Sequence, residues 1–130
     1  MAETQTSEQI IVLVKIKVKE KALRDYLEIA EQTSLAIKNY EKDTLSHNLY
    51  TSAESPNQLS WSIIFKNLES LKSYFNSPII ALFFANHKVL ADEYKMDVYG
   101  IKTEVEIKEL LKLGITTRIY PKKFGYDRIN

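Results

Sequence analysis

Apolar and polar residues alternate in four stretches of the chain, and this alternation is typical of half-buried β-strands. The stretches are Ile10–Val18, Leu45–Thr51, Leu59–Phe65 and Met96–Lys102. The third is the clearest: Leu59, Trp61, Ile63 and Phe65 fall on one face. Seven residues of turn chemistry, Ser52–Gln58, separate it from the second strand, so we expect these two strands to pair as an antiparallel hairpin.

Apolar residues at three- and four-residue spacing predict the helices between these strands. The predicted helices are Ala22–Tyr40, Leu68–Asn76 and a third from Pro78 to about Glu93, with Ile80, Phe83, His87, Leu90 and Tyr94 on one stripe of the third. Asn67 and Ser77 stand where a side-chain oxygen caps a helix start. Pro78 suits the first helical position, because the N–H that it lacks would have no partner there.

The predicted order is β-α-β-β-α-β. It indicates the α+β class, as a ferredoxin-like sandwich with one antiparallel sheet and helices on one face. A further helix begins at Thr103, where a capping-box spacing to Glu106 occurs, and ends near Gly114. Ile115–Tyr120 is the predicted fifth strand. We therefore expect a flexible leader over 1–9, one domain over 10–102 and a helix–strand extension over 103–130.

The predicted sheet is apolar on both faces. Ile11 and Leu13 alternate with Val12 and Val14 on the first strand, and Ile64 lies opposite Ile63 on the third. Helices cover only one face, and an exposed apolar area of roughly several hundred Å² is unusual on a monomer. A homodimer would bury the second face by symmetry and form a dimeric α+β barrel. The extension is then expected to pack on the partner subunit and protect its sheet edge.

The composition narrows the function classes. The chain has 130 residues, 45% of them hydrophobic and 27% charged, with a net charge of +1 and no cysteine. No strong field favours nucleic acid, no apolar run has the length to cross a membrane, and no thiolate chemistry is possible. Because residues 1–9 lack a signal-peptide pattern, we expect a cytoplasmic protein.

Several stretches resemble a known family. The segment Thr44–Ser52 (TLSHNLYTS), then Ser55-Pro56-Asn57, the aromatic strand and Leu68–Ser77 are similar to the antibiotic biosynthesis monooxygenase family of dimeric α+β barrels. This resemblance covers Ile10 to Gly100. Val98–Gly100, Glu109–Gly114 and Phe124–Tyr126 are similar to a branch of that family with a C-terminal extension.

The resemblance implies a cavity inside each subunit, between sheet and helices. Members of the family oxidise phenolic or quinol-type compounds with O₂ and no cofactor, degrade haem, or handle small signalling molecules, and the wider superfamily includes lactone isomerases. The chain departs from the family pattern at two places: Phe65 stands where many members carry Trp, and Tyr74 where many carry His. Haem degraders need both of those residues and an Asn on the first strand, which Ile10–Val18 lacks.

His87 and Tyr74 are the predicted catalytic residues. His87 faces the sheet or a cavity, and a neutral imidazole there could take a proton from a phenolic substrate, since its unperturbed pKa is about 6.5. The alternative is a hydrogen-bonded core histidine. Tyr74 could orient a substrate hydroxyl, and its alternative is an amphipathic packing tyrosine.

The predicted substrate-binding residues are Trp61, Phe65, Asn48, His47, Phe83 and Tyr99. His47 and Asn48 are neighbours on a strand, so only one of them can line a given cavity. Asn48 could hold an oxyanion, while Trp61 either stacks on a planar ligand or belongs to the core. No metal site is expected, because two histidines forty positions apart lack the usual ligand spacing.

The function expected from these residues and from the resemblance is a cofactor-independent monooxygenase that acts on a small aromatic or quinol-type compound. Two alternatives remain open at this point: a binding protein of the same fold that holds a small aromatic ligand without turnover, and a lactone-type isomerase. Activity without O₂ would distinguish the isomerase from the monooxygenase.

Overall fold

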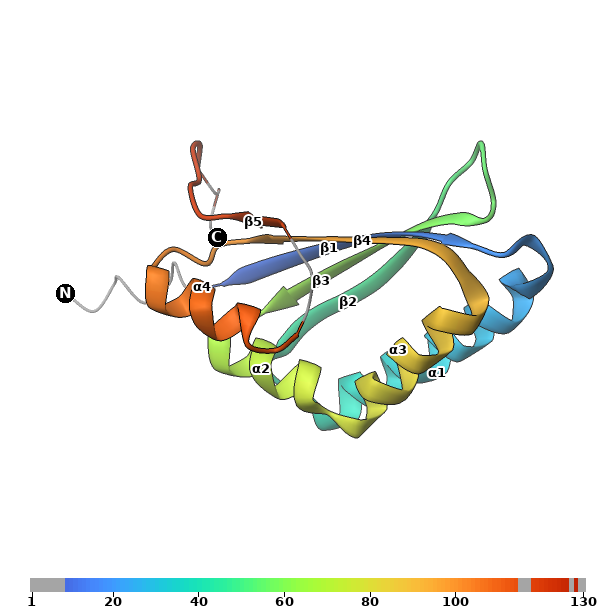
Figure 1. The fold of residues 1–130 in the computed structure, drawn as a ribbon, viewed down its shortest axis with the longest axis horizontal. Coiled ribbons are helices and arrows are strands. Elements are labelled where there is room, and N and C mark those ends of the chain that lie inside the picture. The colour runs from blue at the N-terminus through green and yellow to red at the C-terminus, as the bar shows by residue number, and fades with distance from the viewer. Residues whose placement is uncertain (1–8, 115–117, 127, 129–130) are drawn as a thin grey trace.

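The computed structural model describes residues 9–114, 118–126 and 128 of the chain. Its elements, in order, are β1 (Ile10–Val18), the 3₁₀ turn η2 (Glu20–Ala22), α1 (Leu23–Tyr40), β2 (Thr44–Thr51), β3 (Gln58–Phe65), α2 (Leu68–Asn76), α3 (Pro78–Leu90), β4 (Ala91–Tyr99), α4 (Glu104–Leu111) and β5 (Arg118–Tyr120). The predicted α+β class with β-α-β-β-α-β order is therefore confirmed, with a short helix and strand added after it (Figure 1).

Within the described residues the sheet has the strand order β2-β3-β1-β4-β5. The first four strands pair antiparallel, as the sequence predicts. The fifth, β5, pairs in parallel with β4, so that Val98 lies beside Ile119. The antiparallel sheet expected for the β-α-β-β-α-β unit is therefore confirmed, and the addition of β5 makes the five-stranded sheet a mixed one. The cause is the α4 crossover, which returns the chain to the same end of the sheet before β5 begins.

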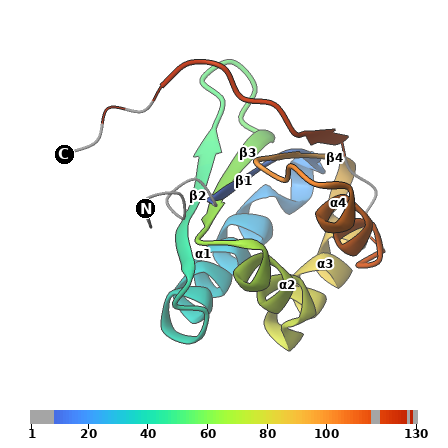
Figure 2. The same ribbon diagram turned by 90° about the vertical axis from the view of Figure 1, so that its left-hand side faces the viewer.

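The two faces of the sheet differ sharply. Helices α1, α2 and α3 lie under one face, and none of the described helices lies on the opposite face (Figures 1 and 2). On the covered face, β1 and β3 bury every second side chain, including Val12, Trp61 and Phe65. On the open face, Ile11 and Leu13 remain 38% and 37% exposed. The core of the molecule thus lies between the sheet and the helices.

The boundary between α3 and β4 differs from the sequence prediction. The helix expected to run to about Glu93 ends at Leu90, and Ala91 already has extended backbone angles, φ −114° and ψ 146°. The strand must begin there because Ala91 pairs with Val18 and Tyr94 pairs with Ile16 of β1. Tyr94 therefore belongs to β4, although it still faces α3, with its ring 5.7 Å from that of His87.

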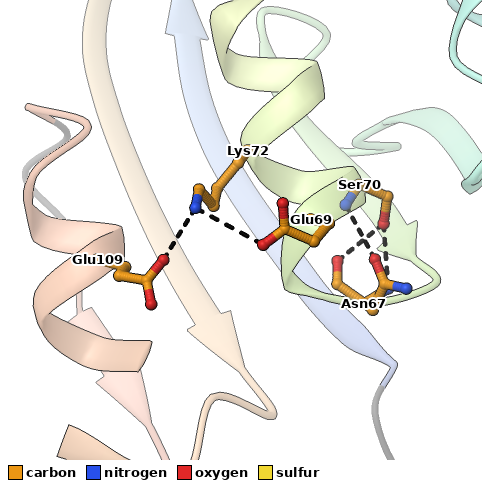
Figure 3. A network of polar contacts seen from close by, with 5 residues as sticks. All are labelled: Asn67, Glu69, Ser70, Lys72 and Glu109. Atoms are coloured by element: carbon orange, nitrogen blue, oxygen red, sulfur yellow. Dashed lines mark hydrogen bonds and ion pairs between the residues drawn. The ribbon is translucent and has the colours of Figure 1, made fainter. Parts of the chain in front are cut away.

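The helix starts follow the predicted caps. The Asn67 side chain accepts a hydrogen bond from the Ser70 backbone N–H at 2.9 Å, and the Asn67 N–H donates to the Ser70 hydroxyl (Figure 3). Ser77 caps α3 in front of Pro78. At Thr103 the predicted capping box with Glu106 is present. These reciprocal bonds satisfy N–H groups that a helix start leaves without partners.

The helix–strand extension packs on the rest of the same chain. Leu110 of α4 is fully buried in the core. Glu109 of α4 accepts a hydrogen bond of 2.8 Å from the Lys72 ammonium group of α2 (Figure 3). On β5, the Tyr120 ring stacks on Tyr99 at 4.8 Å. Packing of this extension on a partner subunit stays a prediction, and residues 1–8 and 115–117 of the predicted leader and fifth strand lie outside the described residues.

Candidate functional site

His87 lies at the centre of a buried hydrogen-bond chain that joins three elements. Its Nε2 atom is 2.8 Å from the Tyr26 hydroxyl of α1, and its Nδ1 atom is 2.8 Å from the Phe83 carbonyl oxygen one turn earlier in α3. Tyr26 also accepts a 2.8 Å bond from the Trp61 indole N–H of β3. Tyr26 is fully buried and His87 is 7% exposed. The predicted helical stripe therefore places His87 inward, as expected.

Donor and acceptor chemistry fixes the direction of every bond in this chain. A backbone carbonyl only accepts, so the Nδ1 atom of His87 carries the hydrogen and donates to Phe83. An indole N–H only donates, so it fills an acceptor position on Tyr26 and leaves the hydroxyl hydrogen to be donated to the Nε2 atom of His87. The Nε2 atom is consequently the unprotonated, basic nitrogen of a neutral imidazole.

Burial holds these groups in their neutral forms. It lowers the pKa of His87 below the usual histidine range, an effect that the bond to the Phe83 carbonyl partly opposes. Burial also raises the pKa of Tyr26 above the usual tyrosine range, and the bond from Trp61 acts in the opposite direction. At neutral pH the site therefore contains an uncharged base and an uncharged phenol.

His47 belongs to a second and separate chain. Its Nδ1 atom shares a 2.7 Å hydrogen bond with the Ser34 hydroxyl, and its Nε2 atom shares one of 2.9 Å with the Tyr74 hydroxyl. Burial lowers the pKa of His47 from 6.5 to about 4. The ring also packs against Trp61 at 4.6 Å between centroids. Trp61 thus stands between the two histidines and contacts both chains.

Two spaces border His87. The inner one, between sheet and helices, has a volume of only about 20 Å³ and is lined by aromatic side chains that include Trp61, Tyr74 and Phe83. A volume of this size suits a single water molecule. The outer one is a surface cleft of about 460 Å³ between the end of α3 and the start of β4. Phe84, His87 and Tyr94 line both spaces and form the wall between them.

The predicted site residues separate into three groups. Trp61, Tyr74, Phe83 and His87 line the inner space together. Phe65 is buried beside it, with its ring 5.1 Å from that of Tyr74, and His47 reaches it only through Tyr74 and Trp61.

Asn48 and Tyr99 form the third group, because both lie on the open face of the sheet. Asn48 is opposite Ser62 of β3 and donates to the Ser46 hydroxyl, while Tyr99 stacks on Tyr120. The sheet itself separates them from His87. The sequence rule that His47 and Asn48 point to opposite faces therefore holds.

Three residues at the site were missed as functional candidates. Tyr26, Phe84 and Tyr94 all contact the His87 ring, with centroid distances of 5.2, 6.0 and 5.7 Å. The predicted stripe of the third helix already included Tyr94. The sequence contains no signal that the Tyr26 hydroxyl of α1 forms a hydrogen bond with His87, 61 residues later.

Nowhere in the described residues do three His, Asp or Glu side chains gather as a metal site would require. Among the described helices, none combines the length and apolar character needed to span a membrane.

Comparison with known proteins identifies the fold. The sequence matches no family model and no curated protein. MupZ from Pseudomonas fluorescens superposes with a TM-score of 0.75 over 93% of this chain and 95% of its own, at 12% identity. A proposed antibiotic biosynthesis monooxygenase from Bacteroides thetaiotaomicron gives a TM-score of 0.66, with 70% and 87% covered at 14% identity. Another from Deinococcus radiodurans gives 0.65, with 69% and 89% covered at 13% identity. The chain therefore has the ferredoxin-like fold of the proteins described as antibiotic biosynthesis monooxygenases.

Proposed function

We propose that the protein is a cofactor-independent monooxygenase that oxidises a small phenol or quinol with O₂. The observation that carries this proposal is the neutral imidazole of His87, whose basic nitrogen is defined and whose ring separates an aromatic interior from an open cleft. The shared fold supports it, since two of the similar structures are described as proposed monooxygenases.

The outer cleft is the space in which such a substrate would first bind. Its volume of about 460 Å³ lies within the usual range for small-molecule sites, roughly 300–1,000 Å³. Phe84 and Tyr94 supply aromatic surface, and Lys88, Asp92 and Glu93 supply charge at the rim. The inner space accepts a ring only if Phe84 or Tyr94 moves, because about 20 Å³ is far below the volume of an aromatic ring.

The reaction needs a base and no external electron donor. His87 takes a proton from the substrate hydroxyl, and the resulting anion gives an electron to O₂. A C–O bond then forms between the substrate carbon and the reduced oxygen, and the peroxide takes the proton back from His87. Loss of the remaining C–H proton then breaks the O–O bond of the hydroperoxide. One oxygen atom leaves with the former O–H and C–H hydrogens as water, and the other stays on the attacked carbon as a C=O group. The substrate supplies all the electrons.

The test is O₂ uptake with a panel of quinols and anthrone-type phenols. His87→Gln keeps a hydrogen-bond donor and acceptor at this position but removes the base. We expect turnover to fall by about 10²- to 10⁴-fold, the usual contribution of a positioned general base. Asn86→Ala, one position earlier on α3 and outside both spaces, is the matched control and should keep its activity. Equal turnover in a folded His87→Gln variant would remove His87 from the mechanism.

A second candidate function is binding of a small aromatic ligand without turnover. Both ring nitrogens of His87 already have partners within the chain, as they would in a histidine whose role is structural. Binding of naphthol-type ligands, followed by Trp61 fluorescence, without O₂ uptake by any member of the panel would favour this candidate. Conversion of a lactone under anaerobic conditions would favour an isomerase.

A homodimer through the open sheet face is part of the proposal. Its support is the exposed Ile11 and Leu13 on that face, and the position of the segment after β5, which lies on the same side of the sheet (Figures 1 and 2). Phe124 of that segment is 90% exposed and Tyr126 is 75% exposed. Aromatic side chains with so little cover on their own chain suit contact with a second copy.

A further inference from the structure

We propose that Tyr26 and Trp61 are positioning residues that keep the Nε2 atom of His87 free of a proton. The inference deepens the proposed function, because a general base works only in its unprotonated form. It concerns the state of the histidine itself, however, and can be tested without any turnover.

The argument begins with the Tyr26 oxygen. A phenol oxygen lies in the plane of its ring and offers two main directions for hydrogen bonds there. The Trp61 N–H occupies one of them, at 2.8 Å, and can only donate. The hydroxyl hydrogen is thereby directed along the other, toward the Nε2 atom of His87 at 2.8 Å. Trp61 thus sets the orientation of Tyr26, and Tyr26 sets the state of His87.

Protonation of His87 would break this arrangement. A hydrogen on Nε2 would meet the hydrogen of Tyr26, and the hydroxyl could not turn away because Trp61 blocks its other direction. Tyr26 is fully buried, so water cannot supply a new partner. A buried hydrogen-bonding group that is left without a partner destabilises the state that contains it. The chain from Trp61 to His87 therefore favours the neutral imidazole beyond the effect of burial.

The other side of the ring fixes the tautomer. The Phe83 carbonyl accepts from the Nδ1 atom at 2.8 Å, so the single hydrogen of the neutral ring stays on that nitrogen. Both partners of His87 thus require the same tautomer.

The remaining titratable groups near His87 come from α2, α3 and β4. Tyr74 of α2 lines the same inner space as His87. Tyr94 lies with its ring 5.7 Å away, and Lys88, Asp92 and Glu93 line the outer cleft. The two carboxylates would stabilise a charged imidazole and the lysine would oppose it. Because these groups stay unchanged when Tyr26 or Trp61 is replaced, any shift in the His87 titration reports the hydrogen-bond chain.

The test is nitrogen-15 NMR of the full chain labelled at histidine, titrated with acid. The protein has two histidines, so spectra of His87→Gln and His47→Gln assign the signals. In the wild type, we expect His87 to show a protonated Nδ1 and an unprotonated Nε2. In Tyr26→Phe and in Trp61→Phe, its protonation midpoint should rise by about one pH unit, a tenfold change in equilibrium.

Tyr74→Phe is the matched control, because it removes the hydroxyl from the partner of the other histidine. It should alter the His47 signals and leave the His87 midpoint in place. The inference is overturned if the wild-type Nε2 atom carries the hydrogen, or if both variants titrate like the wild type. If Tyr26→Phe does not fold, the inference is tested by the protonation midpoint of His87 in Trp61→Phe and by the tautomer of His87 in the wild type. Absence of turnover with every quinol would refute the monooxygenase and leave these spectra unaffected.

Discussion

At the scale of single residues, the two histidines are held in different ways. His87 has one carbonyl partner and one directed phenol, so its tautomer is determined. His47 has two hydroxyl partners, from Ser34 and Tyr74, and a hydroxyl can donate or accept. Either tautomer of His47 therefore satisfies its surroundings. Burial is therefore the cause that keeps His47 neutral. The effect of pH on His47 is simpler to interpret than the effect on His87, because no hydrogen-bond partner of His47 favours one protonation state.

His47 should make the fold sensitive to mild acid. Its pKa falls from 6.5 to about 4 in the folded chain, so between these values the unfolded chain binds more protons. Stability from this group is complete above pH 6.5 and declines as the pH falls toward 4, by up to about 3 kcal/mol. Urea unfolding of the wild type at pH 7.5 and 4.5 measures the loss. His47→Gln should show a smaller loss between the same two pH values, and an equal one would contradict the assignment.

At the scale of elements, alternation and helical spacing predicted each strand and helix of the β-α-β-β-α-β unit, and side-chain caps predicted where helices begin. These local rules did not predict where α3 ends. The chain becomes extended from Ala91 to Tyr94 because both residues pair with β1. That change depends on β1, whose Val18 lies 73 residues before its partner Ala91. The sequence also did not predict that β5 pairs in parallel with β4. That pairing depends on the position of α4, after which the chain re-enters the sheet at the same end as β4.

The contribution of α4 can be divided into its core contact and its ion pair. Leu110 is fully buried, so Leu110→Ala should destabilise the fold by about 2–5 kcal/mol. Glu109→Gln, on the neighbouring residue, breaks the pair with Lys72 and should lower the melting temperature much less, since an ion pair that water still reaches contributes little. Thermal unfolding of the two variants checks this order. A larger effect of Glu109→Gln would mean that the ion pair, rather than the core, attaches α4.

At the scale of the whole molecule, the candidate site shows where prediction from sequence stops. The inward direction of His87, Trp61 and Phe83 followed from local periodicity, whereas Tyr74 was named from its place in the family pattern. Their partnership did not follow from periodicity, because the bond from Tyr26 to His87 joins two helices that lie far apart in the chain. The small interior volume depends on how six aromatic rings and the His87 imidazole fill one space, which no spacing rule describes.

The open face of the sheet has two halves of different character. Ile11, Leu13 and Ile64 lie together at one end, where β1 pairs with β3. Lys15, Lys17 and Lys95 lie at the other, around a hollow of about 380 Å³. A second copy of the chain would therefore be expected to contact the apolar half, because lysine ammonium groups are costly to remove from water.

Leu13→Glu tests this arrangement, since it places a charge in the apolar half without touching the core on the other face. Sedimentation of the wild type at micromolar concentration should give twice the 15.1 kDa mass of one chain, and Leu13→Glu should shift it to a single chain. Leu82→Glu on α3 is the matched control, because Leu82 is 66% exposed on the helical side and should leave the dimer intact. A wild type that sediments as one chain would refute the dimer. If only Leu82→Glu dissociates the protein, the contact between the two copies lies on the helices instead. The open sheet face would then be exposed to water in solution.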